Sequence, residues 1–129
     1  MKIYVAARFF DKDKLKAVYK RLKTDGHKIT ADWSKHLDPA PYDKNQQLCK
    51  QYALKDLKGV LDCEVFILLT NEKTGSGSST ELGAALALNN LLKKPKIYIV
   101  GKHLNNVFYL HPAVNIKKTI KEVYRELKS

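Results

Sequence analysis

A glycine- and serine-rich loop followed by a glutamate is the part of this sequence best suited to chemistry. Gly75 and Gly77 allow backbone amides to face an anionic ligand, and Ser76 and Ser78 add hydroxyl donors beside them. The loop lacks the Lys-Ser/Thr ending of a P-loop, so it does not match that phosphate-binding motif. Glu81 adds a carboxylate directly after the loop, and it is the first candidate for a reactive group.

The sequence leaves two interpretations of Glu81 open. Ser78 and Glu81 have the spacing of a capping box, in which the serine caps a helix and the glutamate bonds back to the cap's own amide. On these two residues alone, the structural interpretation is favoured. However, residues 78–80 hold three hydroxyls, which is more than a cap needs, and Gly83 and Ala84 leave space beside the carboxylate. The alternative is therefore that Glu81 faces a ligand.

Asp56 is the second candidate carboxylate. At about 100° per residue it shares a narrow helical sector with Cys49, Ala53 and Val60 rather than with the neighbouring lysines. A carboxylate on an apolar stripe must be paired, hydrogen-bonded or left with a raised pKa, and acid/base chemistry uses such groups. The alternative, equally open, is that Asp56 lies at the rim of the stripe and reaches water or a backbone amide.

Composition indicates one globular domain over residues 1–129, since 44% of the residues are hydrophobic. No apolar run approaches the roughly 20 residues of a membrane span, and no signal peptide is evident, so we expect a cytoplasmic protein. Cys49 and Cys63 lack metal-ligand spacing and are expected to be reduced core residues. The four histidines, His27, His36, His103 and His111, are scattered, and most of them are expected at the surface. No metal or other cofactor is predicted.

The net charge of +11 raises the question of nucleic-acid binding. Of the 24 basic residues 21 are lysines, whereas base and phosphate recognition favours the planar fork of arginine. The lysines fall mostly on the polar sides of predicted helices, which is typical of a solvated surface. The composition therefore argues against a nucleic-acid partner, although the charge would attract small anions such as nucleotides.

Apolar runs and helical periodicities alternate along the chain. The predicted strands are 3–7, 27–33, 63–70 and 96–100, and the predicted helices cover about 15–22 (capped by Asp11 or Asp13), 43–60, 79–92 and 116–127, with 101–112 irregular. This alternation favours an α/β, flavodoxin-like doubly wound parallel sheet of about five strands with helices on both faces. Ligands of such sheets bind beyond the carboxyl ends of the strands, where the loop before Glu81 is expected.

Four segments in order carry a family resemblance. They are Ile3–Ala6, Lys55–Asp62, Gly75–Ala87 and Lys94–Tyr98. Together they resemble the nucleoside 2-deoxyribosyltransferase superfamily, which includes the deoxynucleoside 5′-monophosphate N-glycosidases. The resemblance covers residues 2 to about 114. It implies a flavodoxin-like homodimer or higher homo-oligomer that acts on a small nucleoside or nucleotide and needs no metal or redox cofactor.

The resemblance also implies roles for individual residues. Glu81 matches the glutamate that attacks C1′ of the sugar, and Asp56 matches the general acid/base at the leaving base. Tyr4 matches a strand tyrosine that contacts both the glutamate and the sugar. Glycosidic cleavage commonly uses two carboxylates in these two roles. The loop 75–78 corresponds to the segment that receives the 5′ end of the substrate, and the segment 106–109, with Asn106 and Tyr109, to one that completes a neighbouring subunit's site.

Arg8 is the residue expected to bind a phosphate group of the substrate. The loop after the first predicted strand, residues 7–11, departs from the family's glycine- and serine-rich form, and Arg8 is its one arginine. With Ser76 and Ser78 it is expected to form charge-assisted hydrogen bonds to a 5′-monophosphate. The predicted function is cleavage of an N-glycosidic bond by hydrolysis or base transfer. The alternative is a non-catalytic nucleotide-binding module on the same fold.

Overall fold

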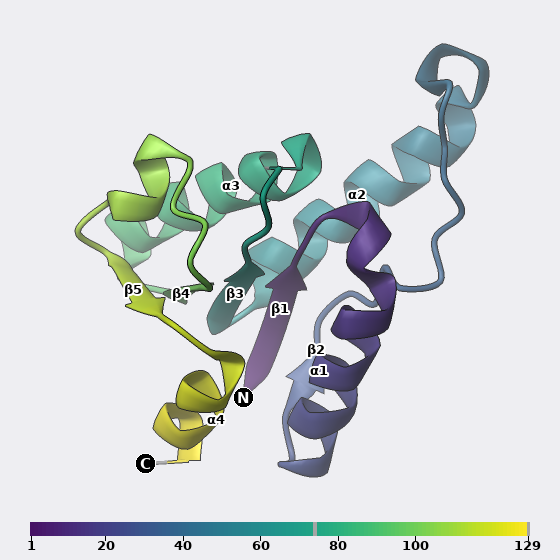
Figure 1. Cartoon of the computed structure of the whole chain (residues 1–129). Helices are drawn as coiled ribbons and strands as arrows, with labels where there is room; N and C mark the ends of the chain where they lie inside the picture. The colour runs from purple at the N-terminus through teal and green to yellow at the C-terminus, as the bar shows by residue number, and fades with distance from the viewer. Residues whose placement is uncertain (74, 129) are drawn as a thin grey trace.

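A computed structural model describes residues 1–73 and 75–128 of the chain, and within them five parallel strands form one sheet in the order β2-β1-β3-β4-β5 (Figure 1). The strands are β1 (Lys2–Ala6), β2 (Lys28–Ile29), β3 (Val65–Leu69), β4 (Lys96–Val100) and β5 (Val114–Lys117), and the helices are α1 (Lys12–Thr24), α2 (Gln46–Asp62), α3 (Ser76–Leu92) and α4 (Ile120–Lys128). Short 3-10 helices are η1 (Phe9–Asp11), η2 (Tyr42–Lys44) and η3 (Val107–Leu110). This strand order is that of flavodoxin-like folds, so the predicted fold class is confirmed.

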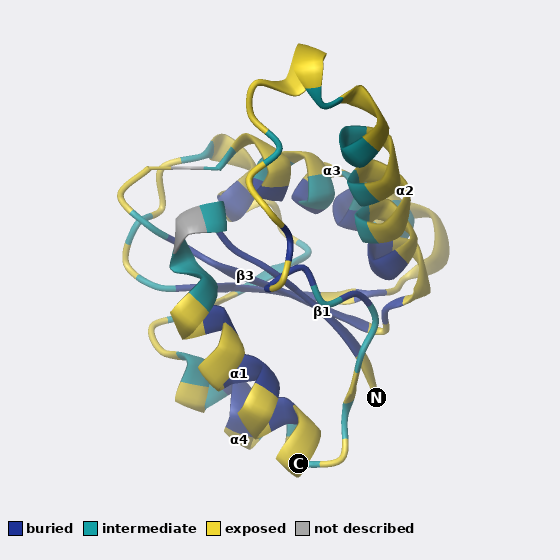
Figure 2. Cartoon of the chain, turned by 90° about the vertical axis from the view of Figure 1, so that its right-hand side faces the viewer, coloured by how far each residue is buried: buried dark blue, intermediate teal, exposed yellow. Residues whose placement is uncertain are grey.

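Helices cover both faces of the sheet. α1 and α4 lie together on one face, and α2 and α3 lie side by side on the other (Figure 2). Because both faces are covered, the central strands are apolar along their whole length, as in β3, where all five residues are buried. Tyr4 of β1 is fully buried and stacks on Phe66 of β3, with 5.9 Å between ring centroids. The core therefore holds the inner strands rigidly below the loops at their carboxyl ends.

The second predicted strand is much shorter in the structure. Only Lys28 and Ile29 pair with β1, and the chain then leaves the sheet. Trp33 explains part of this course, because its indole Nε1 donates to the backbone oxygen of Val5 at 2.9 Å. The Trp33 side chain thus bonds to a backbone oxygen of β1 just beyond the residues that pair with β2. Residues 30–41 form a loop above the edge of the sheet.

The last strand was not predicted, and the prediction of Ile116 in the C-terminal helix is wrong. Ile116 lies in β5 opposite Ile99 of β4, and the helix α4 begins at Ile120. The four-residue spacing of Ile116, Ile120 and Tyr124 resembles a helical period although it crosses from a strand into a helix. Pairing with an adjacent strand outweighed that local pattern, because β5 completes the hydrogen bonds of β4.

The helix α2 also differs from its predicted bounds. It begins at Gln46 rather than near Asp43, because Tyr42–Lys44 forms the separate turn η2, and it continues to Asp62. The described helices include none that is both long and apolar enough to cross a lipid bilayer.

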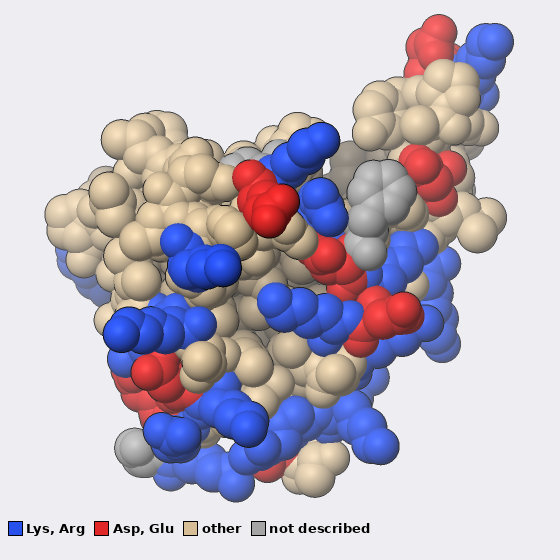
Figure 3. All heavy atoms as spheres, viewed as in Figure 1, with Lys and Arg blue, Asp and Glu red and all other residues tan. Residues whose placement is uncertain are grey.

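Basic side chains are spread widely over the face of the molecule seen in Figure 3. They gather most densely in the lower half of that view, around α1 and α4, with acidic side chains among them. The arrangement resembles the solvated surface expected from the sequence, with the lysines of α1 turned away from its buried residues Leu15, Val18, Tyr19 and Leu22.

Glu126 fastens α4 to the sheet, and its replacement gives the first prediction. Its carboxylate binds Lys117 (2.7 Å), Lys96 (2.8 Å) and the hydroxyl of Tyr98 (3.0 Å), and these donors, Lys117 first, lower the pKa of Glu126 to about 2. An acidic group whose pKa is lowered by folding stabilises the folded state at any pH above the pKa that the group has in the unfolded chain. This stabilisation is lost as the pH falls toward 2.

We therefore expect Glu126→Gln to lower the thermal midpoint of unfolding at pH 7, with the deficit shrinking as pH falls from about 4.5 toward 3. Glu72→Gln, at an exposed loop carboxylate, is the matched control and should leave the midpoint unchanged at every pH. A deficit for Glu126→Gln that is constant over this pH range would contradict an electrostatic anchor.

Candidate active site

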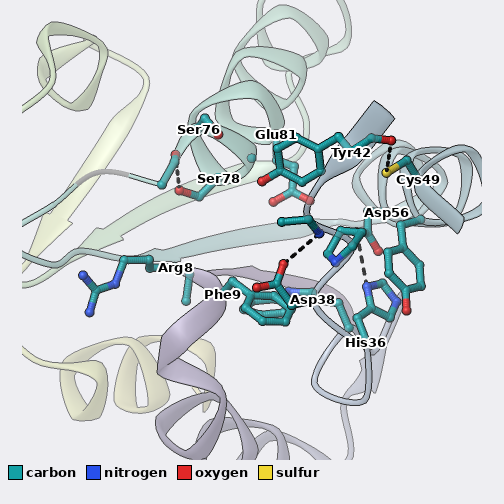
Figure 4. A pocket seen from close by; sticks show the side chains of 17 residues that line it. Arg8, Phe9, His36, Asp38, Tyr42, Cys49, Asp56, Ser76, Ser78 and Glu81 are labelled. Atoms are coloured by element: carbon teal, nitrogen blue, oxygen red, sulfur yellow. Dashed lines mark hydrogen bonds and ion pairs between the residues drawn. The ribbon is translucent and has the colours of Figure 1, made fainter. Parts of the chain in front are cut away.

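A cavity of about 690 Å³ opens at the carboxyl ends of β1 and β3 (Figure 4). It lies between the start of α3, the helix α2 and the loop that follows β2, which is where ligands bind in doubly wound sheets. Its lining residues are Ala7, Arg8, Phe9, Trp33, His36, Asp38, Pro39, Ala40, Tyr42, Cys49, Tyr52, Asp56, Gly75, Ser76, Gly77, Ser78 and Glu81. Of the site residues predicted from the sequence, Arg8, Asp56, Glu81 and all four of the loop 75–78 are thus brought together.

Glu81 projects from α3 toward the sheet. The Tyr4 hydroxyl donates a short hydrogen bond to Oε2 of Glu81, which joins the helix to the first strand. Burial raises the pKa of Glu81 to about 8; the bond from Tyr4 opposes that rise and the charge of Asp56 adds to it. Burial, followed by the charges of Glu81 and Asp56, also raises the pKa of Tyr4, so the phenol remains a donor. The carboxylate is therefore held in position and is easily protonated in the free protein.

The capping-box interpretation of Glu81 is wrong. The helix α3 begins at Ser76 with Gly75 as its N-cap, so Ser78 lies inside the first turn instead of ahead of it. The Ser78 hydroxyl donates to the backbone oxygen of Gly75 at 2.9 Å. Because the helix starts three residues earlier than predicted, Glu81 lies in the second turn, where its side chain reaches the strand tyrosine and not the helix end.

The first turn of α3 presents hydrogen-bond donors to the cavity. No side chain of the described residues caps the Gly75 end of this helix. The first helical bond at this end is from the amide of Ser79 to the oxygen of Gly75, at 3.1 Å. The amides of Ser76, Gly77 and Ser78 precede that bond and belong to the first turn, whose donors have no partner within a helix. Such a turn, at the positive end of the helix dipole, suits an anion.

Arg8 stands beside this turn. Its Cα lies 3.5 Å from the position that a side chain on Gly75 would occupy, so glycine allows the loop after β1 to approach the helix closely. The guanidinium lies 3.8 Å from Asp11, and Asp11 also accepts from Asn71 at 2.9 Å. Asp11 occupies the N-cap position of α1 as predicted but makes no capping bond, because its carboxylate serves these neighbours. In Figure 4 the guanidinium points away from Glu81 and Asp56.

Asp56 faces the cavity from α2, on the side opposite Arg8 in Figure 4. Burial raises the pKa of Asp56 to about 6, and the nearby Lys55 opposes that rise. Its Oδ1 is buried and has no hydrogen-bond partner among the described residues. The alternative in which Asp56 reaches a backbone amide is therefore not what the structure shows.

His36 lines the cavity, although the sequence predicts that most of the histidines lie at the surface. Its ring stacks on Tyr52 with 3.8 Å between centroids, and its Nδ1 lies 3.9 Å from Oδ2 of Asp56. Burial, with the charges of Lys55 and Lys12, lowers the pKa of His36, so the ring is neutral near pH 7. No local pattern marks His36, because it lies in an irregular loop. Only the packing of that loop over α2 brings the ring to Asp56.

Asn106 and Tyr109 lie outside the cavity. The side chain of Asn106 caps η3 by accepting from the amide of Phe108 at 2.9 Å, and Tyr109 is buried in the core of its own chain. A role for this segment in a neighbouring subunit's site stays a prediction. Within the same turn the residues exposed to solvent are Val107, Phe108 and Leu110, and not Tyr109.

Both cysteines are free, as predicted, but only Cys63 is a core residue. Cys49 is half-buried and lines the cavity, with its Sγ 3.9 Å from the backbone oxygen of Tyr42. Over residues 1–73 and 75–128, no three histidine, cysteine or acidic side chains are grouped so that they could hold a metal ion.

No protein-family model matches this chain, and no curated protein matches it. Among solved structures it is similar to the CMP N-glycosidase BcmB of Clostridium botulinum. The two align with a TM-score of 0.63 over 100% of both chains, at 18% sequence identity. The chain therefore shares its fold, a doubly wound α/β sheet, with this N-glycosidase.

Proposed function

We propose that this protein is an enzyme that cleaves the N-glycosidic bond of a nucleoside 5′-monophosphate, by hydrolysis or by transfer to another base. The observation that carries the proposal is the meeting of two carboxyl groups with raised pKa values, Glu81 and Asp56, in one cavity with the donor-rich first turn of α3. Pairs of carboxyl groups whose pKa values differ are the usual means of glycosidic cleavage. The printed activity of the structural neighbour, an N-glycosidase of CMP, agrees with this proposal.

The two carboxyl groups act in sequence. The reactive form of the singly protonated pair is the one in which Asp56 holds the proton and Glu81 is ionised, and the higher pKa of Glu81 makes this the minor form. In that form Glu81 attacks C1′ while the bond from C1′ to the base nitrogen breaks, and Asp56 gives its proton to the leaving base. The products of this step are the free base and a sugar ester of Glu81. Asp56, now ionised, takes a proton from water as the water oxygen attacks C1′, which releases the sugar and restores both carboxyl groups. In base transfer, the nitrogen of an incoming base replaces the water.

Tyr4 and the walls of the cavity assist this chemistry. The bond from the Tyr4 hydroxyl holds Glu81 in one orientation and favours its ionised form, against the effect of burial. Packing around Glu81 in the cavity wall buries its carboxyl group, which strengthens the attraction between the carboxylate and the positive charge that develops on the sugar. Tyr4 is therefore a positioning residue as well as a contact of Glu81.

A panel assay tests the proposal directly. Ribo- and deoxyribonucleosides and their 5′-monophosphates are incubated with the protein, and the free base is measured by chromatography. We expect base release from at least one monophosphate. The competing proposal, a non-catalytic nucleotide-binding module, predicts nucleotide binding by calorimetry with no base release from any member of the panel.

Replacement of Arg8 tests whether the end of the cavity beside the first turn of α3 binds a phosphate. The position of Arg8 beside the first turn of α3 suits charge-assisted hydrogen bonds to a phosphate, which are about twice as strong as neutral ones. Arg8→Ala is expected to raise KM for a monophosphate by about tenfold, with any activity on the free nucleoside nearly unchanged. Arg125→Ala, on α4 away from the cavity, is the control and should change neither value. A preference of the unmutated protein for free nucleosides, with Arg8→Ala silent, would favour a nucleoside transferase instead.

We further propose that the protein forms a homodimer through α2 and α3. These two helices pack side by side, and their outer surface carries leucines that a monomer would leave in water, among them Leu54 (75% exposed), Leu61 (52%) and Leu91 (75%). Leu61 of α2 and Leu92 of α3 line one hollow between the two helices, and apolar surface that is exposed and contiguous marks contact sites between proteins.

The double substitution Leu54→Lys/Leu61→Lys is expected to convert the dimer into a monomer, measured by sedimentation at micromolar concentration. Leu37→Lys, at a leucine that is 72% exposed on the loop after β2, is the matched control and should stay dimeric. A monomeric unmutated protein, or a dimer that survives the double substitution, would contradict this interface.

A further inference from the structure

The cavity has two chemically different ends. Arg8 and the first turn of α3 supply donors and positive charge at one end, and Asp56 lies with His36 at the other end (Figure 4). A nucleotide has a matching polarity, with a phosphate at one end and a base at the other. Because Glu81 must reach C1′ between them, the end with Asp56 and His36 is the one that meets the base.

Hydrogen-bonding groups at this base end still need partners. Oδ1 of Asp56 and Nε2 of His36 are both buried, and neither has a partner among the described residues. Leaving a buried polar atom unsatisfied is unfavourable, so such atoms in a cavity are expected to meet ligand atoms. Several polar positions on one edge of the base would be recognised together.

Asp38 adds an acceptor to this end of the cavity. It lies on the loop after β2, in the cavity wall, and in Figure 4 it is seen between Phe9 and the pair His36–Asp56. The amide of Ala40 donates to Oδ1 of Asp38 at 3.0 Å, which orients the carboxylate. Its Oδ2 accepts no hydrogen bond from the described part of the chain. Asp38 is exposed on the cavity wall, so its Oδ2 is open to a hydrogen-bond donor on a ligand in the cavity.

We propose that Asp38 makes the enzyme selective for bases with an exocyclic amino group, cytosine or adenine, over their oxo counterparts, uracil and hypoxanthine. This inference rests on the proposed function and names its substrate class. The amino group of such a base donates to a carboxylate, as it does when acidic side chains recognise cytosine. An oxo group at the same position would bring its lone pairs against the carboxylate oxygen, which is repulsive.

The protonated form of Asp56 complements this choice. In cytosine the amino group stands next to the ring nitrogen N3, which only accepts a hydrogen bond, and Asp56 in its acid form donates. The same proton is the one that the departing base requires. A base that donates to Asp38 and accepts from Asp56 therefore matches both carboxyl groups, whereas uracil presents the opposite pattern at these two positions.

The test measures binding in a background without turnover. Dissociation constants of CMP, UMP, AMP and IMP, and of their deoxy forms, are determined by calorimetry for Glu81→Gln and for Glu81→Gln/Asp38→Asn. We expect the first variant to bind the amino member of each pair at least about tenfold more tightly. Adding Asp38→Asn, whose amide both donates and accepts, should bring the two members of each pair to nearly equal affinity. Asp43→Asn, at an exposed carboxylate of η2 outside the cavity wall, should leave the preference intact.

Equal binding of amino and oxo bases by Glu81→Gln, or a preference that survives both Asp38→Asn and Asp38→Ala, would overturn this assignment. Failure of nucleotide binding altogether would overturn it as well. Base release by the unmutated protein is measured separately. If the protein prefers amino bases through Asp38 but releases no base, the proposed catalysis is contradicted and the base selection by Asp38 is upheld. If it releases base but shows no such preference, the catalysis is upheld and the selection by Asp38 is contradicted.

Discussion

Glu81→Gln is expected to lower the rate of base release by about 10³-fold or more while the protein stays folded. The amide has the size of the carboxyl group and still accepts the bond from Tyr4, but it lacks the negative charge and the nucleophilicity needed at C1′. The rate is measured by single-turnover release of base, and the fold by circular dichroism. Glu72→Gln, outside the cavity, is the control and should release base at the unmutated rate. Full base release by Glu81→Gln would mean that another group is the nucleophile.

The same substitution is expected to stabilise the protein at high pH. Burial raises the pKa of Glu81 to about 8, so the folded state holds a proton that the unfolded chain has already lost. A raised acidic pKa therefore destabilises the fold progressively as pH rises from about 4.5 to about 8, and Gln, which does not ionise, removes that loss. Glu81→Gln should match the unmutated protein at pH 4 and exceed it above pH 8 by on the order of a few kcal/mol.

Urea unfolding at pH 4 and pH 8.5 checks this difference. It also separates a catalytic role from a structural one, since a carboxylate whose main purpose was to hold α3 on the sheet would leave the protein weaker when replaced. A lower stability of Glu81→Gln at pH 8.5 would contradict the electrostatic account of this site.

Asp56→Asn is expected to slow cleavage by about 10²- to 10⁴-fold, most strongly for bases that leave poorly without a proton. The pH dependence is more informative than the rate. The unmutated protein should give a bell-shaped profile of kcat/KM with limbs near pH 6 and pH 8, which belong to the coupled pair Asp56 and Glu81. The bell alone does not say which carboxyl group carries the proton.

The pH profile of Asp56→Asn shows which carboxyl group carries the proton. If Asp56 is the acid and Glu81 the nucleophile, Asp56→Asn loses the alkaline limb, and its residual activity rises with pH to a plateau as Glu81 ionises. That rise should come somewhat below pH 8, because the charge of Asp56 raises the pKa of Glu81 and is now absent. A residual activity that is flat at low pH and falls as Glu81 ionises would reverse the two roles. Equal slowing of good and poor leaving groups would point to a positioning role for Asp56.

Much of this protein is determined by local sequence. The apolar runs of β1, β3 and β4 and the helical spacing of α1 need no information from distant residues, since covered parallel strands are apolar throughout and a surface helix is apolar at intervals of three and four. From this alternation the fold class follows. The direction of Asp56 toward the apolar side of its helix is also a local property, because about 100° per residue sets it.

The contacts that make a site of these residues depend on the tertiary structure. The bond between Tyr4 and Glu81 joins residues 77 positions apart, and the pKa of about 8 at Glu81 comes mainly from the burial that this packing creates. Ser78 and Glu81 satisfied a capping pattern, yet the helix began at Ser76, because helix ends depend on what the first-turn groups meet in space. His36 and Asp38 lie in an irregular loop without any period, and only the folding of that loop over α2 turns them toward the carboxyl groups. Patterns of two and 3.6 residues thus determine the elements, whereas burial and through-space contacts, which no short window contains, decide the chemistry.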